Sequence, residues 1–364
     1  MWFVIWLVAF FAKGMDAYDV YYRSELLQPL ELKPYGRNIT ILDDQLDSVE
    51  IISLTDASGL LYWHRKIYTP VCQTGECKEI DVGIYWKCNG EFLGLEVYNE
   101  HLTKTDHSVF SDTDYLKLVD VLMNDWSILR EYEYDDLLSE PLYETEGSDT
   151  DAVTGATRKE IADETVADAV YTTYTLWHLI HVGEKEQLRS GTADLLNGDS
   201  KMLGLLLEAG DTQYLSMIME LFADGKLAFS SEVGELISRS LLSEHRVHRE
   251  LAFKSLSKFN FQDLSIQDQL ADIYPELQPN EKIRVLNYMK NPNQLSALWY
   301  NTLIKDLDKS EEWLVSRTLD AVKKYKPQNP NIVKLAQALT TNSNSFTKQA
   351  AIDFLKYAYP EGEP

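Results

Sequence analysis

The sequence predicts an α+β N-terminal domain with an antiparallel sheet, followed by an all-α, solenoid-like helical domain. β-branched and aromatic residues form strand-like runs between about Asp47 and Tyr98, whereas strand patterns give way to helical periodicity from about Lys201. We therefore expect a signal peptide at 1–14, an α+β domain at 15–195 and helical repeats at 196–364. A chain of 364 residues is long enough to give both domains a core.

The composition is that of a folded and strongly acidic protein. Hydrophobic residues make up 45% of the chain and charged residues 25%, both close to the globular average. The net charge of −24 repels phosphate backbones, so nucleic acid is not an expected partner. No stretch reaches the roughly 20 apolar residues of a membrane-spanning helix, and no transmembrane span is expected.

The strongly apolar run from Trp2 to Ala12 has the length of a secretory signal core. It is followed by Ala12-Lys13-Gly14, a small-x-small pattern that suits a signal peptidase. No Lys or Arg precedes the run, so a short buried segment or an earlier start is the alternative. The pattern favours export, and we expect a periplasmic or otherwise extracytoplasmic (secreted) protein.

Three cysteines, Cys72, Cys77 and Cys88, lie within one short stretch. In an oxidising compartment Cys72 and Cys77 would close a small disulfide loop and leave Cys88 as a thiol. Three reduced thiols are the alternative.

The predicted sheet has strands at 49–54, 61–71 and 80–98. Asn89-Gly90 divides the last run and indicates a hairpin, because both turn positions tolerate positive φ. A helix is expected after the cap at Ser111, with apolar positions from Tyr115 to Leu122 on its buried face. The acidic segment from Glu131 to Asp151 is expected to be a solvated connection.

The apolar periodicity of the second half predicts helices in pairs. The starts of these pairs recur at intervals of about 30 to 37 residues, which is typical of helical solenoids. We interpret it as an armadillo- or HEAT-like stack, with a compact orthogonal bundle as the alternative. The expected helices lie near 201–209, 212–224, 230–242, 246–258, 265–273, 280–290, 294–305, 310–325, 330–340 and 345–358.

One short motif points to a cofactor. The segment Asp151-Ala152-Val153-Thr154-Gly155-Ala156-Thr157 resembles the flavinylation motif Asp-x-x-Ser/Thr-Gly-Ala-Thr of the FMN-binding domain family. That family includes extracytoplasmic subunits of ion-pumping oxidoreductases. The resemblance implies that a flavin transferase attaches FMN through its phosphate to Thr157, with Asp151, Thr154, Gly155 and Ala156 as the recognised frame. It also implies that 15–195 is an FMN-binding-like domain.

The residues around Thr157 suit a phosphate on their own terms. Thr157-Arg158-Lys159-Glu160 has the spacing of a capping box, which predicts a helix from Arg158 toward His181. The N–H groups and dipole of a helix N-terminus favour an anion, and Arg158 and Lys159 add positive charge. Thr157 is followed here by Arg158-Lys159, whereas several family members have another small hydroxyl residue at this place. The alternative is an ordinary N-cap at Thr157 without a cofactor.

An isoalloxazine ring needs apolar or aromatic walls. The candidates are aromatic residues of the sheet and of the following helix, although such residues more often pack in the core. The residues are Trp63, Tyr85, Trp86, Tyr171, Tyr174 and Trp177.

Two His-x-x-His pairs, His178/His181 and His245/His248, lack the further ligands that would complete a metal site, so no metal is expected. No acid–base or nucleophile motif is visible. The expected function is therefore an extracytoplasmic electron-transfer protein that carries FMN on Thr157 and docks to a redox partner protein. The alternative is a cofactor-free periplasmic or surface protein-binding module that uses the solenoid.

Overall fold

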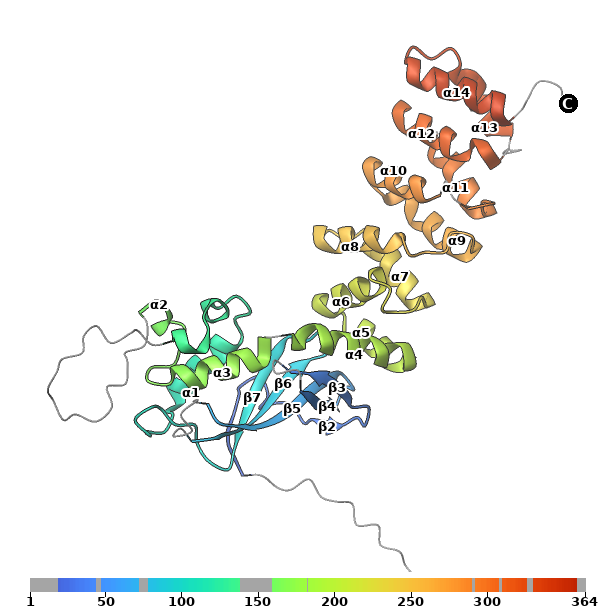
Figure 1. Ribbon diagram of the computed structural model, residues 1–364. Coiled ribbons are helices and arrows are strands. Elements are labelled where there is room, and N and C mark those ends of the chain that lie inside the picture. The colour runs from blue at the N-terminus through green and yellow to red at the C-terminus, as the bar shows by residue number, and fades with distance from the viewer. Residues whose placement is uncertain are drawn as a thin grey trace, which may run out of the picture. The chain divides into compact units, whose positions relative to one another are not determined.

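The computed structural model describes residues 19–43, 47–71, 78–137, 159–181, 183–289, 292–307, 310–325 and 330–358. The chain divides into two compact units, 1–195 and 196–364. The first is an antiparallel sheet with helices and the second is all-helical, as the sequence predicts (Figure 1). Cys72, Cys77 and the apolar run at 2–12 lie outside the described residues.

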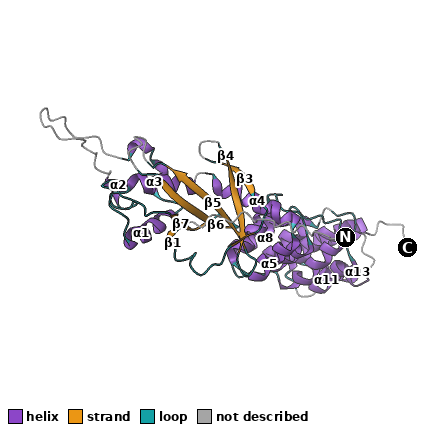
Figure 2. Ribbon diagram, turned by 90° about the horizontal axis from the view of Figure 1, so that it is seen from below, coloured by secondary structure: helices purple, strands orange, loops and turns teal. Residues whose placement is uncertain are grey.

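The sheet of the first unit has the order β1-β7-β6-β5-β4-β2, and β3 pairs with β4; every pairing is antiparallel (strands in orange, Figure 2). The four longest strands confirm the runs expected from the sequence, whereas three short strands were missed. The strands are β1 Val20–Arg23, β2 Lys33–Pro34, β3 Ile39–Leu42, β4 Ser48–Thr55, β5 Leu61–Thr69, β6 Ile80–Lys87 and β7 Phe92–Tyr98.

The hairpin between β6 and β7 is confirmed, but its turn differs from the expected two-residue one. The Gly90 N–H donates to the Lys87 carbonyl and the Lys87 N–H to the Glu91 carbonyl, which closes a three-residue loop. Gly90 has φ 79°, whereas Asn89 keeps a negative φ. This is a turn with a glycine bulge, in which one left-handed residue is enough to match the twist of the strands.

Helices cover one face of the sheet. Trp63 and Trp86 face each other across β5 and β6 and are fully buried there. The Trp63 indole N–H donates to Thr192 Oγ1 at 3.0 Å, which ties the sheet to α4. The helices are α1 Asp112–Leu122, with the expected cap at Ser111, α2 Lys159–Ala162, α3 Val170–His181 and α4 Glu184–Gly198, with 3-10 turns η1 Ile128–Glu131 and η2 Tyr134–Asp136.

The single helix predicted from Arg158 toward His181 is wrong. α2 ends at Ala162, and α3 begins only at Val170. Between them the chain reverses through Asp168, which has φ 59°, and the Val166 N–H donates to Thr173 Oγ1 at 3.2 Å. A left-handed residue cannot continue a right-handed helix, so the helix that begins beside the motif is limited to one short turn.

The second unit confirms all ten predicted helices to within about three residues, with boundary differences of the usual size. Alternate helices pack side by side, α6 on α8 and α10 on α12 in one row, α7 on α9 and α9 on α11 in the other. The helices are α5 Ser200–Ala209, α6 Thr212–Ala223, α7 Ser231–Ser240, α8 Arg246–Leu256, α9 Leu264–Ile273, α10 Pro279–Tyr288, α11 Ala297–Leu307, α12 Glu312–Val322, α13 Pro330–Leu339 and α14 Ser345–Ala358.

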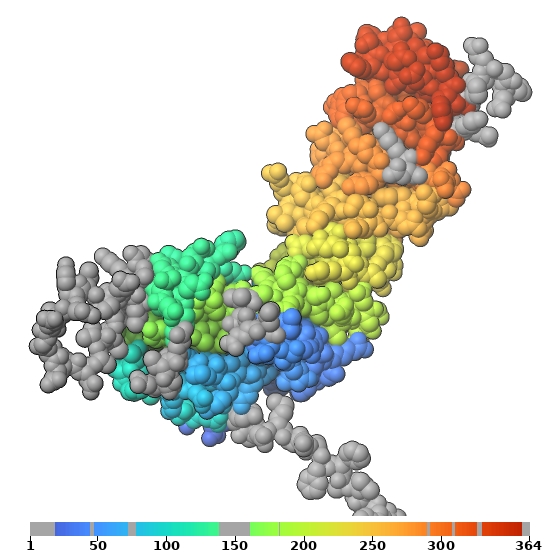
Figure 3. All heavy atoms as spheres, in the orientation of Figure 1, coloured from blue at the N-terminus to red at the C-terminus, as the bar shows by residue number. Residues whose placement is uncertain are grey.

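The helix pairs are a structural repeat. From α9 onward, each helix begins 33 residues after its equivalent in the preceding pair. Equivalent positions are buried alike: Ile237, Leu270, Leu303 and Ala336 in one row, and Ala252, Val285, Thr318 and Ala351 in the other. Each pair thus packs on its neighbours through the same positions, as in a solenoid, and the pairs form successive bands in Figure 3.

Candidate functional site

Most of the predicted cofactor site lies outside the described residues. This holds for Asp151, Thr154, Gly155, Ala156, Thr157 and Arg158. Lys159 is the first residue of α2, which places a helix start next to the motif. That helix has four residues, so its dipole is much smaller than the one expected from a helix reaching His181.

Both ends of the chain segment that holds the motif are anchored in the fold. Before it, η2 ends at Asp136 and the following Leu137 is fully buried. After it, Ile161 of α2 is fully buried, and Lys117 of α1 donates to the Asp163 carbonyl at 2.6 Å. The described chain therefore leaves the fold directly after η2 and re-enters it beside α1.

An aromatic cluster lies at this place. The rings of Tyr134 and Tyr171 stack, with centroids 4.8 Å apart and planes 22° apart. Tyr174 packs edge-on against Tyr134 and its hydroxyl donates to the Tyr132 carbonyl at 3.0 Å. Tyr171 is half-buried, and burial, with the charge of Asp135, raises its pKa. This cluster is the aromatic surface nearest in the chain to both ends of the motif segment.

The six predicted wall residues do not form one site. Tyr171 and Tyr174 lie together in the aromatic cluster. Trp63, Trp86 and Trp177 are buried core residues, as the alternative held, and Trp177 donates to the Asn124 carbonyl at 3.0 Å. Tyr85 lies on the opposite face of the sheet from Trp63 and Trp86, because side chains alternate along a strand.

The histidine pairs have other partners. His181 Nε2 lies 2.8 Å from the Leu122 carbonyl and Nδ1 lies 3.4 Å from Asp125, while burial lowers the His181 pKa. His178 Nδ1 lies 3.0 Å from the Tyr174 carbonyl. His245 and His248 have ring centroids 5.7 Å apart. Within the described ranges, no three His, Cys, Asp or Glu side chains gather in a way that would hold a metal ion.

Sequence reasoning missed a buried polar cluster on the sheet face that α4 does not cover. Glu96 on β7 is 5% exposed, and one of its oxygens, Oε2, accepts from the Tyr85 hydroxyl at 2.7 Å and the Tyr98 hydroxyl at 2.8 Å. Its Oε1 forms an ion pair with Arg23 of β1 at 2.9 Å. The carboxylate is therefore held by three donors from three strands, which offsets the cost of burying its charge.

Gly83 makes room for this cluster. It pairs with Glu96 across the strands, and a Cβ at Gly83 would lie 2.3 Å from the Tyr98 hydroxyl and 2.9 Å from His64 Nε2. Within the described structure, that buried His64 nitrogen has no hydrogen-bond partner. The signal of this polar cluster in the sequence is the spacing of Gly83-x-Tyr85 and Glu96-x-Tyr98, which puts polar groups on one face of apolar strands.

Electrostatics keep the cluster's phenols and imidazole neutral. Burial, assisted by Glu96, raises the pKa of both Tyr85 and Tyr98. Burial lowers the His64 pKa to about 4, with nearby Glu96 opposing the shift and Lys66 adding to it. At neutral pH the phenols therefore donate to the one buried carboxylate, and His64 is uncharged. The cluster therefore holds the Glu96 carboxylate between one guanidinium and two neutral phenols.

Comparison with protein-family models, with curated proteins and with solved structures finds no match. Among the helices that the structure describes, none combines the length and the apolar character of a membrane span.

Proposed function

We propose that the protein is an exported electron-transfer protein that carries FMN, phosphodiester-linked to Thr157, and exchanges electrons with a redox partner protein. The observation that carries the proposal is the match of Asp151, Thr154, Gly155, Ala156 and Thr157 to the flavinylation motif. Bound FMN would supply the redox chemistry. A flavin transferase is the maturation partner that this attachment requires.

The described residues support the proposal in two ways. The segment that holds Thr157 is anchored at both ends, by buried Leu137 and buried Ile161, on an α+β unit. Next to these anchors the stacked pair of Tyr134 and half-buried Tyr171 offers an aromatic surface of the kind that a flavin ring packs on. Arg158 and Lys159 are the two basic residues between Glu131 and Asp168, and they would favour a phosphate there.

The test is co-expression of the full chain with a flavin transferase, followed by denaturation and intact-mass measurement. We expect a mass increase of one FMN less one water, and retention of flavin absorption after denaturation. Thr157→Ala should abolish the adduct and leave the fold intact, because losing a helix cap costs only about 1 kcal/mol. Thr150→Ala is the matched control outside the motif and should be modified like the wild type.

An unmodified wild-type chain, with a known flavoprotein substrate modified in the same cells, contradicts the proposal.

The alternative function is a cofactor-free module that binds proteins through the helical stack. It is favoured by the repeat itself, because solenoids present extended binding surfaces. That alternative predicts no adduct on Thr157 under any condition.

A further inference from the structure

Trp126 stands out from the surface of the α+β unit. It is 80% exposed, whereas Trp63 and Trp86 on the sheet are fully buried. The guanidinium of Arg130 lies over its ring, 5.1 Å from the centroid. Trp and Arg are the residues most often found as energetic anchors of protein interfaces. An indole in water with a cation stacked on it therefore points to a binding surface.

The turn that presents Trp126, Asn124–Ser127, is fixed by its neighbours. The Trp126 N–H donates to Asn124 Oδ1 at 3.0 Å, and the Asn124 carbonyl accepts from Trp177 of α3 at 3.0 Å. Lys185 of α4 donates to Asp125 at 2.6 Å. A side chain presented on a fixed turn loses little conformational entropy on binding. The exposure of Trp126 is thus built into the fold.

The surroundings of Trp126 are acidic. Arg130 itself is paired with Glu131 at 3.3 Å. Exposed carboxylates close to Trp126 in the chain are Asp120, Glu131, Glu133, Asp135 and Asp136. Two such surfaces would repel each other, so a partner for Trp126 needs apolar walls flanked by positive charge.

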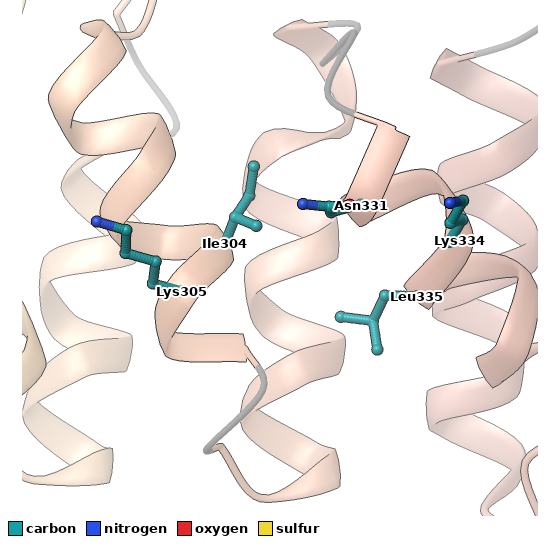
Figure 4. Close-up of a pocket in the computed structure, with 5 residues that line it drawn as sticks. All are labelled: Ile304, Lys305, Asn331, Lys334 and Leu335. Carbon is teal, nitrogen blue, oxygen red and sulfur yellow. The ribbon is translucent and has the colours of Figure 1, made fainter.

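The helical unit has a groove of that chemistry between α11 and α13 (Figure 4). Ile304 on α11 and Asn331 and Leu335 on α13 point into it, and Lys305 and Lys334 flank it on either side. The volume is about 560 Å³, which is ample for an indole ring. Both lysines are exposed, and neither forms an ion pair with a described residue.

We propose that Trp126 of one copy of this chain inserts into the α11–α13 groove of a second copy. Ile304 and Leu335 would cover the indole, and Lys305 and Lys334 would face the carboxylates around the turn. The contact joins two different surfaces, so it runs head to tail. An anchor of this size with a charged rim gives a weak interface, with a Kd of about 10 μM to 1 mM. This inference does not depend on the flavin.

Sedimentation velocity of the full chain over a concentration series tests the proposal. The wild type should associate as its concentration rises, and added salt should weaken the association. Trp126→Ala, and separately Lys305→Glu with Lys334→Glu, should each weaken it at least about tenfold. Mixing these two variants should restore association and stop at a one-to-one complex, because one intact turn and one intact groove remain.

The controls match the variants in kind. Phe346→Ala removes an aromatic side chain that is 83% exposed on α14, and Lys348→Glu with Lys356→Glu makes the same charge change on that helix. Both should associate like the wild type. A wild type that stays monomeric up to millimolar concentration overturns the proposal. A Trp126→Ala variant that changes only the sedimentation coefficient of the monomer, and not the association, overturns it as well. A mixture of the two variants that stays monomeric overturns it equally.

Discussion

The two units carry charge differently. Residues 1–195 have 36 acidic and 15 basic side chains, a net charge of −21, whereas residues 196–364 have 22 and 19, a net charge of −3. In the helical unit, ion pairs join neighbouring repeats: Arg284 binds both oxygens of Glu250 at 3.0 Å, and Arg249 lies 3.3 Å from Glu281. The acidity of the whole chain is therefore a property of its α+β unit, where a flavin and a partner surface are proposed.

One buried carboxylate in each unit shows a different way of holding a charge. In the sheet, Glu96 accepts from Tyr85 and Tyr98 and pairs with half-buried Arg23. In the helical unit, Lys282 of α10 and Asp306 of α11 form a buried pair at 2.7 Å, each side chain 10% exposed. A carboxylate held by several donors tolerates the loss of one of them better than a carboxylate held by a single ion pair. Loss of the cation at Asp306 should therefore be costly to the stability of the helical unit.

The largest effect is expected at the isolated pair. Lys282→Met leaves Asp306 buried without its cation, although the Ser310 hydroxyl still donates to it, and should lower the free energy of unfolding by about 3 to 5 kcal/mol. Adding Asp306→Leu should recover most of the loss, because no unpaired charge then remains. Urea unfolding checks both. Arg239→Ala, which breaks an exposed pair with Glu235, is the control and should cost less than about 0.5 kcal/mol.

A glycine exchange compares the two units directly. Gly83→Ala should cost about 3 kcal/mol, because its Cβ would overlap the buried Tyr98 hydroxyl. Gly204→Ala in α5 meets nothing within 4 Å and should stabilise the chain by about 0.5 to 1 kcal/mol. Urea unfolding of both variants measures the difference. Equal effects of the same sign would contradict the tight packing assigned to the sheet face.

An effect that develops only below about pH 6.5 is expected at His64. Burial holds its folded pKa at about 4, below the unfolded value, so the unfolded chain binds the proton first as pH falls. Stability should therefore be full above about pH 6.5 and decline by up to about 1.4 kcal/mol per pH unit until pH 4. His64→Gln should flatten that part of the profile. An unchanged slope in the variant would show that His64 is not its source.

Periodicity predicted much of the fold, because it reports which face each element buries. The 33-residue repeat makes this signal strong in the helical unit, where all ten helices were found. β1 to β3 were missed because they are two to four residues long and depend on their pairing partners. The break at Asp168 was missed because a left-handed aspartate is visible only in the backbone.

The cofactor motif and the polar cluster show the two limits of sequence reasoning about sites. A motif such as 151–157 is visible because its residues are adjacent. Glu96, Tyr98 and Arg23 are far less visible, because they meet only once β1 pairs with β7.

The position of the last helix of the α+β unit decides where the chain can be shortened. A cut near Gly191 would remove Thr192, which accepts from Trp63 and donates to the Cys88 carbonyl. The α+β unit should therefore be kept to Gly198, where α4 ends.

The decisive measurement is the intact mass of a chain that ends at Gly198, co-expressed with a flavin transferase. Because Thr157 and the proposed aromatic surface both belong to the α+β unit, this chain should fold and carry one FMN on Thr157 at the same occupancy as the full chain. A shortened chain that stays unmodified or insoluble, while the full chain is modified, would contradict the account. The helical unit would then be part of the cofactor site.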